Sequence, residues 1–254
     1  MLDLGHVAAV VLLILLVITV GVWLKTRSQL GEIQKEKDQI VGEEMRMFDF
    51  LHHIGQAIEK DITPAQLYKE IVEGFDEVLG ADAGAIYLLS EDREYLVPKF
   101  ISVNCPPLIS VPQQVIERSK ANPSALTSYV MLARVGTGEG LLGEVVTAEA
   151  SMRVDNLQDH ESLGATSDLY DHGVSAMLST LQYGGRNIGV VAVVRKHENG
   201  LFSDNDYDVF RSVSEQSAFA MGNAMIHQEL TEKRKLDDEL RTAREVQNVL
   251  LPSA

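Results

Sequence analysis

The sequence predicts an α+β domain in which an antiparallel sheet is flanked by helices. Two pairs of apolar, strand-like segments, at 85–103 and 176–194, are each divided by a short turn of polar residues or glycine. Segments whose apolar residues follow a helical period precede the first pair and follow the second. This order favours an antiparallel sheet covered by helices rather than a parallel one. With 254 residues, the chain has room for one such domain and accessory segments.

The charge of the chain argues against nucleic acid as a partner. There are 37 acidic residues against 22 basic ones, a net charge of −15, and the longest basic run is Lys233-Arg234-Lys235. Nucleic-acid binding depends on basic groups that neutralise phosphates. The lone Cys105 excludes an intramolecular disulfide and is typical of a reducing compartment.

An apolar segment predicts a membrane anchor over residues 1–27. Residues 7–24 carry no charge, so a helix over them can nearly cross the bilayer core. A cleaved secretory signal is the alternative, but the first six residues contain no Lys or Arg and no small-x-small cleavage site follows. Lys25 and Arg27 follow the segment directly, while Asp3 precedes it. This bias predicts a single pass through the cell inner membrane, with the C-terminal part in the cytoplasm.

Residues 28–60 are expected to form a coiled-coil stalk in a parallel homodimer. Apolar side chains recur every seven residues at Ile33, Ile40, Met47 and Ile54, as at the d positions of a heptad. The matching a positions are apolar at both ends and charged in the middle, which a parallel dimer tolerates at a cost in stability. A helix that packs on its own domain remains the alternative, because periods of 3.5 and 3.6 residues are hard to separate over so few turns.

The globular domain is expected over residues 45–225, and it begins with a helix and a hairpin. Thr63 and Pro64 are typical of a helix start, and the apolar residues that follow keep a helical spacing. The segment 85–103 is typical of a hairpin, in which Pro98 indicates an edge strand or a bulge.

The second part of the domain is predicted to contain a long loop, a short helix and another hairpin. The proline-containing stretch 104–122 is expected to be irregular, and 129–133 to form a short strand. The glycine run that starts at 136 leads into a short helix through 146. The hairpin 176–194 follows, and a long helix from about Asp204 closes the domain.

Two stretches of the domain carry ordered motifs: GTGEGLLGEVVTAEASMRVDNLQD and GRNIGVVAVVRKHENGLFSDNDYDVFRSVSEQSAFAMGNA. The first has a G-x-G-x-x-G-x-V run and a strand that ends in Val-Asp. The second has a hairpin strand, a Phe-Ser-Asp-x-Asp helix start and a closing helix that ends in Asn-Ala. In these motifs the chain resembles GAF sensor domains. The resemblance implies a six-stranded or similar antiparallel sheet, a side pocket for a small-molecule ligand, and dimerisation through terminal helices.

The glycines of the first stretch also match the G-x-G-x-x-G of a dinucleotide-binding fold. Asp155 and Asp159 lie at roughly the twenty-residue distance at which such folds carry an acid. That fold requires a buried parallel strand before the glycines and a crossover helix after them. The hairpins on either side argue against it.

The resemblance places a ligand pocket between the central strands and the neighbouring loops. The residues expected at this pocket are Tyr129, Arg134, Glu144, Asp155 and Leu178. No catalytic residue and no metal site are expected, since no cluster of Cys, His and acids has metal-site spacing. A pocket without a ligand, in a domain that serves mainly for dimerisation, is the alternative.

Known ligand chemistries of such domains match the chain only in part. Cyclic-nucleotide receptors tend to carry Asn-Lys and a later Phe-x-x-x-Asp-Glu, where this chain has Arg195-Lys196 and FSDNDY. Bilin attachment needs a Cys near the pocket, and Cys105 has no neighbouring His. Haem needs an axial ligand such as His160 or His172, and a lone loop His is more typical of a solvated residue. No cofactor is therefore expected in this chain.

Residues 226–254 are predicted to form a coiled-coil output linker, with a plain linker helix as the alternative. The final string LDDELRTAREVQNVLLP resembles the linker that opens bacterial PPM-type serine/threonine phosphatase domains of the sporulation stage II E class. Its pattern, E-L-x-x-A-R-x-[VI]-Q-x-x-L-L-P, is matched by Glu239, Leu240, Ala243, Arg244, Val246, Gln247, Leu250, Leu251 and Pro252. The resemblance implies a downstream domain whose Asp residues bind two Mn²⁺ or Mg²⁺ ions and activate water against a phosphoprotein substrate.

The same segment also resembles the H-E-L-R-T-P box of sensor histidine kinases. Asp238 stands in place of the phosphoacceptor His, and without an imidazole no phosphohistidine can form. The sequence therefore predicts a membrane-anchored, homodimeric sensing region that controls a PPM-type phosphatase. A non-enzymatic dimerisation adaptor and the sensor region of a degenerate kinase are the alternatives.

Overall fold

The computed structural model describes residues 47–50, 52, 54–55, 62–170 and 173–250. The predicted anchor and most of the predicted stalk lie outside these residues. Within the described ranges, no helix is both long and apolar enough to cross a membrane. The chain divides into two units, and the second, Asp49–Ala254, contains the whole of the domain described below.

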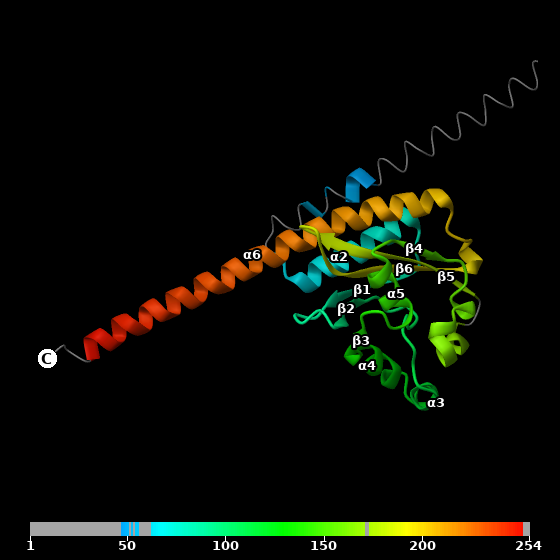
Figure 1. Ribbon diagram of the computed structural model, residues 1–254, viewed down its shortest axis with the longest axis horizontal. Helices are drawn as coiled ribbons and strands as arrows, with labels where there is room; N and C mark the ends of the chain where they lie inside the picture. Colours follow the sequence, from blue (N-terminus) through cyan, green and yellow to red (C-terminus); the bar gives the residue numbers. More distant parts are fainter. Residues whose placement is uncertain (1–46, 51, 53, 56–61, 171–172, 251–254) are drawn as a thin grey trace, which may run out of the picture. The chain divides into compact units, whose positions relative to one another are not determined.

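A six-stranded sheet forms the centre of the domain, with the strand order β3-β2-β1-β6-β5-β4 (Figure 1). The strands are β1 (Ala83–Leu89), β2 (Tyr95–Ile101), β3 (Val135–Gly136), β4 (Met152–Val154), β5 (Val174–Tyr183) and β6 (Arg186–Lys196). All neighbouring strands pair antiparallel, which confirms the predicted sheet. The short strands β3 and β4 form its two edges, so little unpaired backbone is left at either side.

Helices cover both faces of the sheet. They are α2 (Pro64–Leu79), α3 (Gln113–Ala121), α4 (Ser124–Leu132), α5 (Gly140–Ala148) and α6 (Asp204–Leu250), with 3-10 segments at Leu157–Asp159, Glu161–Leu169 and His197–Asn199. Figure 1 shows α2 and α6 side by side on one face and α3, α4 and α5 on the other. The domain therefore has the α+β layers that the order of its segments predicts.

The predicted first helix is confirmed with both of its end signals. The Thr63 hydroxyl accepts a hydrogen bond from Gln66 N, and the Gln66 side chain accepts one from Thr63 N at 3.0 Å, which completes a capping box. Gly80 ends the helix with φ 64°, a left-handed conformation that glycine adopts without strain. The apolar face of α2 is buried, and the rings of Phe75 and Phe210 lie 5.4 Å apart between α2 and α6.

Both predicted hairpins are confirmed. In the first, the register between β1 and β2 shifts next to Pro98, which pairs with Tyr87. Proline cannot donate a ladder hydrogen bond, so a bulge at this position agrees with the prediction. The second hairpin turns at Gly184 and Gly185, both with positive φ. Its strands β5 and β6 are almost wholly buried and form the core of the sheet with β1.

Two local predictions are wrong. The stretch 104–122 is not irregular throughout, because α3 occupies 113–121, and 129–133 is not a strand, because α4 runs to Leu132. Each of these helices buries a single side chain, Ile116 in α3 and Val130 in α4. A helix that buries so little shows only a weak helical period of apolar residues. The prolines therefore led to the prediction of an irregular stretch, and the apolar run at 129–133 to the prediction of a strand.

Two apolar side chains that precede α2, Phe50 and Ile54, pack on the domain. Phe50 and Ile54 are 3% and 5% exposed, and the ring of Phe50 lies 6.1 Å from that of Phe75. Gly74 makes room for this contact, since a Cβ there would lie 2.2 Å from the Phe50 ring. At this end of the predicted stalk, burial of Ile54 agrees with the alternative of a helix that packs on its own domain.

Candidate functional site

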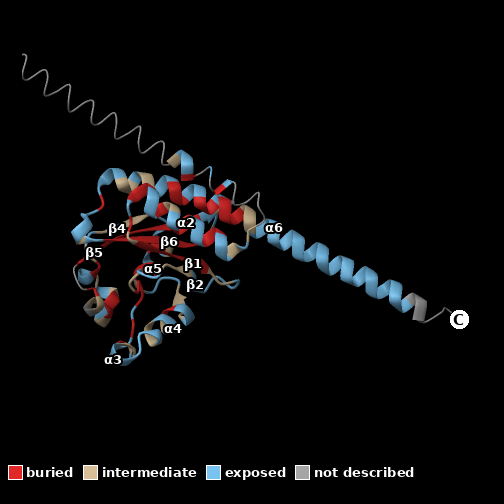
Figure 2. Cartoon of the chain, turned by 180° about the vertical axis from the view of Figure 1, so that it is seen from behind, coloured by how far each residue is buried: buried red, intermediate tan, exposed pale blue. Residues whose placement is uncertain are grey.

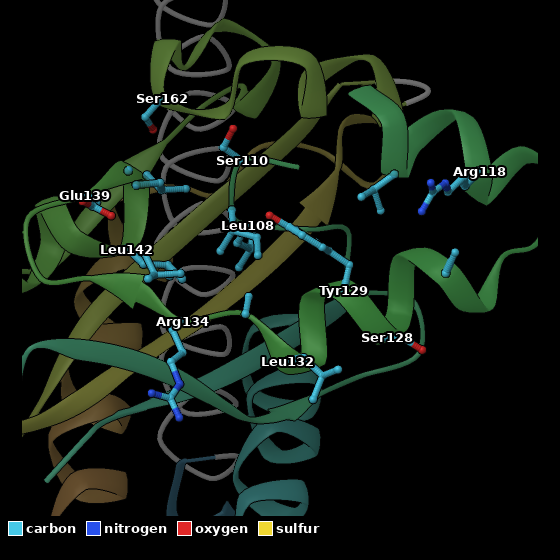
Figure 3. Close-up of a pocket in the computed structure, with 17 residues that line it drawn as sticks. Leu108, Ser110, Arg118, Ser128, Tyr129, Leu132, Arg134, Glu139, Leu142 and Ser162 are labelled. Carbon is cyan, nitrogen blue, oxygen red and sulfur yellow. The ribbon is translucent and has the colours of Figure 1, made fainter. Parts of the chain in front are cut away.

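A cavity of about 830 Å³ lies on the face of the sheet covered by α3, α4 and α5. Its size is in the range of small-molecule sites. Figure 3 shows its lining side chains. They are Leu108, Ile109, Ser110, Val115, Arg118, Ala125, Ser128, Tyr129, Leu132, Ala133, Arg134, Val135, Glu139, Gly140, Leu141, Leu142 and Ser162. Most of them are apolar, and the few polar groups among them are available to orient a ligand.

The floor of the cavity is tightly packed, whereas its outer wall is not. Leu108, Leu141 and Leu142 are at most 1% exposed and belong to the main hydrophobic core. The outer wall is formed by α3 and α4, neither of which has a side-chain cap at its N-terminus. Because each of these helices also buries only one side chain, the outer wall is held by fewer buried contacts than the floor.

The glycine run places the start of α5 at the cavity. Gly138 and Gly140 have φ of 96° and 62°, which other residues rarely adopt. A Cβ on Gly143 would lie 2.6 Å from the backbone of Gly138, so the turn and the helix approach too closely for a side chain. The run therefore serves a tight turn into a short helix. With an antiparallel sheet around it, the dinucleotide alternative does not hold.

Two of the five predicted pocket residues line this cavity. Tyr129 is half-buried, and Figure 3 shows its hydroxyl pointing toward Leu108 and Ser110. Arg134 also lines the cavity, but in Figure 3 its guanidinium points away from the other lining side chains. Its charge contributes to the lowered pKa of Asp92, which is caused first by the hydrogen bond from the Ser90 hydroxyl.

The other three predicted residues lie elsewhere. Glu144 is on α5, 3.6 Å from the Nε2 of His160. Asp155 follows β4, 3.5 Å from the Nε of Arg153. Leu178 is wholly buried in the core on β5. Of the five residues expected at the pocket, the structure therefore places Tyr129 and Arg134 on the lining of this cavity and the other three outside it.

The sequence interpretation missed most of the apolar floor and Arg118. Leu108, Val115 and Arg118 fall in 104–122, which was expected to be irregular, while Leu141 and Leu142 belong to the glycine run. A usable signal was present, because Pro112 directly precedes Gln-Gln-Val-Ile-Glu-Arg, a run of mostly good helix formers. A helix predicted there would have placed Val115 and Arg118 on one face, three residues apart.

Comparison with known proteins identifies the domain. The family model described as GAF domain matches residues 61–222. The chain belongs to the GAF domain family. Among curated protein sequences, none matches this chain.

Solved structures share this fold at low sequence identity. The GAF domain of a phosphoenolpyruvate-protein phosphotransferase from Coxiella burnetii is 17% identical, with a TM-score of 0.53, and the match covers 73% of this chain and 98% of that one. The corresponding domain from Acinetobacter is 19% identical, with a TM-score of 0.50 and coverage of 72% and 97%. Free methionine-R-sulfoxide reductase from Neisseria meningitidis is 15% identical, with a TM-score of 0.51 and coverage of 71% and 91%. Since regulatory domains and an enzyme share the GAF fold, the fold alone does not assign a chemistry to this chain.

Cys105 lies beside a second cavity, of about 480 Å³, between the end of β2 and α4. Burial raises the pKa of its thiol to about 12. Because the thiolate is the reactive form, Cys105 is a poor nucleophile near neutral pH. The nearby Tyr170 donates a hydrogen bond from its hydroxyl to Pro107 O at 2.5 Å, and burial raises its pKa. These groups serve the packing of the loop that carries the cavity floor.

In the described part of the chain, no group of three or more His, Cys, Asp and Glu side chains is placed to hold a metal ion. His160 contacts the hydroxyl of Ser162 at 2.8 Å through its Nδ1. His172, the other haem candidate, lies outside the described residues.

Arg195, which replaces the Asn of the cyclic-nucleotide motif, has a structural position in this GAF domain. Its guanidinium donates to the backbone carbonyls of Leu79, Gly80 and Leu201 and lies 3.3 Å from Asp206. It also stacks over the ring of Phe202 at 4.2 Å. These contacts join the end of α2 to the start of α6, away from the cavity that Tyr129 lines.

Proposed function

We propose that this chain is the sensing region of a membrane-anchored, homodimeric regulator that controls a PPM-type protein serine/threonine phosphatase. Its GAF domain, a signal-sensing regulatory domain, binds a small molecule in the cavity under α3 and α4. Helix α6 carries the resulting change to the phosphatase. The observation on which the proposal chiefly depends is the continuity of α6, which leaves the domain and runs without a break into the linker motif as far as Leu250.

The start of α6 is fixed on the domain. Ser203 and Asp206 form reciprocal hydrogen bonds at its first turn, and Arg153 of β4 donates to Asp204 at 2.7 Å. Phe210, Val213 and Met221 are wholly buried. Because α6 packs directly on the sheet, a displacement of the sheet is expected to displace this helix as well.

The linker residues lie on the exposed part of α6. Glu239, Leu240, Ala243, Arg244, Val246 and Gln247 are all exposed. Leu250 is the last residue of the helix, while Leu251 and Pro252 lie outside the described residues. An exposed helix of this length with leucines along it needs a partner for its apolar side chains. A second copy, paired in parallel, supplies that partner, with Leu236, Leu240 and Ala243 in 4-3 spacing at the contact.

A continuous set of contacts links the cavity to α6. Helix α5, whose first turn lines the cavity, packs against β5 and β6, and β5 packs against α6. At the end of β5, the Tyr183 hydroxyl donates to Asn223 Oδ1 at 2.8 Å. The Tyr183 ring also faces Gly222, where a Cβ would lie 2.1 Å away. A ligand acts through this route if it stabilises one of two arrangements of α6 more than the other.

The membrane location is proposed from the sequence alone. The uncharged residues 7–24 are followed directly by two basic residues. These features support a single pass through the inner membrane, with the GAF domain in the cytoplasm.

The reading frame beyond the codon of Ala254 tests the proposed output. We expect an in-frame domain rich in Asp, whose full-length product releases phosphate from a phosphoserine peptide only when Mn²⁺ or Mg²⁺ is present. Replacing its Asp residues by Asn should abolish this activity without loss of the dimer. A stop codon at this point, or a product inactive with both metals, contradicts the proposal and supports a non-enzymatic dimerisation adaptor.

A further inference from the structure

We infer that the cavity under α3 and α4 takes a small molecule with an apolar body and one anionic group, a carboxylate or phosphate, and that Arg118 binds the anion. This inference rests on the proposed function, because it assumes that the cavity is the sensor site. It adds the chemical class of the ligand and the residue that selects it.

The apolar body is required by the cavity floor. Leu108, Leu141 and Leu142 present buried aliphatic surface to the cavity, and Val115 and Val135 extend it. Water against such a surface is readily displaced by a ligand with an apolar part. A small, fully polar ligand would leave most of this surface uncovered.

The anionic group is indicated by Arg118. Figure 3 shows this side chain on α3, with its guanidinium directed toward the side of the cavity where Tyr129 lies. Two other arginines of the domain have acidic partners: Arg153 pairs with Asp155 and Asp204, and Arg195 with Asp206. Among the described residues, no acid lies within ion-pair distance of Arg118.

The remaining polar groups of the lining agree with one anion rather than a cation. The acid of the lining, Glu139, is at the start of α5, and Figure 3 shows it across the cavity from Arg118. The Tyr129 hydroxyl lies between them and makes no hydrogen bond within the described part of the chain. It can donate to a ligand oxygen, as Arg118 can. Guanidinium groups bind carboxylates and phosphates through paired N–H donors.

Arg118 also has a local effect that the test must separate. It lies in the last turn of α3, where a positive charge favours the helix dipole. Loss of this charge can weaken α3 without any effect on ligand selection. The readout is therefore the preference between matched anionic and neutral ligands rather than the stability of the domain.

The test measures binding of three naphthalenes by fluorescence anisotropy to the full chain in lipid nanodiscs, with empty nanodiscs as the blank. The probes are 2-naphthoate, 2-naphthyl phosphate and the neutral 2-naphthamide. We expect at least one anion to bind about tenfold more tightly than the amide, since charge-assisted hydrogen bonds are about twice as strong as neutral ones. Arg118→Gln should reduce this preference to about twofold and leave the amide affinity unchanged. The preferred anion distinguishes a carboxylate ligand from a phosphate ligand.

Two further variants make the outcomes distinct. Arg211→Gln, on the exposed side of α6, is the matched control and should change no affinity. Ala125→Trp fills the cavity from α4 and should abolish binding of all three probes at an unchanged melting temperature. If Ala125→Trp leaves binding intact, or if no probe binds, the cavity is not the sensor site and the proposed function fails with it. If the probes bind in the cavity with equal affinity, or if Arg118→Gln leaves the preference intact, only the inferred ligand class is wrong.

Discussion

The two halves of α6 have opposite surroundings within one uninterrupted helix. From Asp204 to Gly222, one side of the helix is buried against the sheet and α2. Beyond Met225 every described side chain is exposed, as the pale blue helix in Figure 2 shows. Four of these residues, His227, Gln228, Thr231 and Glu232, line a groove beside the start of α2. Ile226, Leu236 and Leu240 are about half exposed.

This difference shows where each half obtains its stability. The inner half is stabilised by the domain, whereas isolated helices of this kind are marginal in water without tertiary contacts. The outer half has only exposed contacts of its own, such as the pair between Asp238 and Arg241 at 3.3 Å, which contribute little. Within a single chain the outer half therefore lacks stabilising contacts, and pairing with the same helix of a second copy would supply them.

The largest expected effect is on the inner half. Phe210→Ala removes a ring that is wholly buried and packed on Phe75, and should lower the free energy of unfolding by about 3–5 kcal/mol. Phe219→Ala is the control on the same helix. Its ring is 59% exposed and lies 5.9 Å from the Tyr183 ring, so the expected loss is at most about 1.5 kcal/mol. Urea denaturation followed by circular dichroism measures both, and equal losses would contradict the burial of this half.

The boundary between the halves should be sensitive to one methyl group. Gly222→Ala places a Cβ against the Tyr183 ring and should cost about 1–3 kcal/mol of unfolding free energy. In a Tyr183→Ala background the same substitution should be neutral or stabilising, since alanine favours a helix. A double-mutant cycle by thermal unfolding measures this coupling. Additive effects would show that Tyr183 does not hold α6 at this point.

The outer half should affect association and not the fold. Replacing both Leu236 and Leu240 by Ala removes exposed leucines from the proposed contact, and should weaken self-association at least tenfold. The melting temperature of the GAF domain should stay unchanged, because neither leucine contacts it. Sedimentation equilibrium and calorimetry on one preparation test both statements. A lowered melting temperature with unchanged association would contradict this prediction, because it would show that the outer half stabilises the fold and does not mediate association.

The smallest expected effect concerns two serines of the inner half. Ser214 and Ser217 are wholly buried, and within the described ranges their hydroxyls have no hydrogen-bond partner. Each change to Ala should leave the free energy of unfolding unchanged or raise it by up to about 1 kcal/mol. Ser175→Ala is the matched control on β5. Its buried hydroxyl donates to Arg195 O at 3.1 Å, so it should lose about 1 kcal/mol. Destabilisation by all three changes would indicate a bound water or partner at the two serines of α6.

Sequence patterns predicted those elements that bury a whole face. The seven buried residues of α2 repeat at helical spacing, and β5 and β6 form long apolar runs around a Gly-Gly turn, so their types were correct. The predicted hairpin 176–194 is shorter than the observed one, which runs from Val174 to Lys196. Helices α3 and α4 bury one residue each, and the prediction failed there. The prediction of the candidate site was the least complete, because the outer wall of the cavity consists of these two helices. Tyr129 and Arg134 were found through the family resemblance, while Arg118 depends on a helix that the pattern did not reveal.

Disulfide cross-linking along the outer half of α6 tests the central claim most directly. In a Cys105→Ser background, Leu240→Cys should cross-link to its copy in high yield under mild oxidation, because the two helices face each other there in a parallel dimer. Glu245→Cys, on the far side of the same exposed segment, should cross-link poorly at equal protein concentration. Equal yields at the two positions, or no dimer from Leu240→Cys, would contradict the parallel pairing by which sensing is proposed to reach the output.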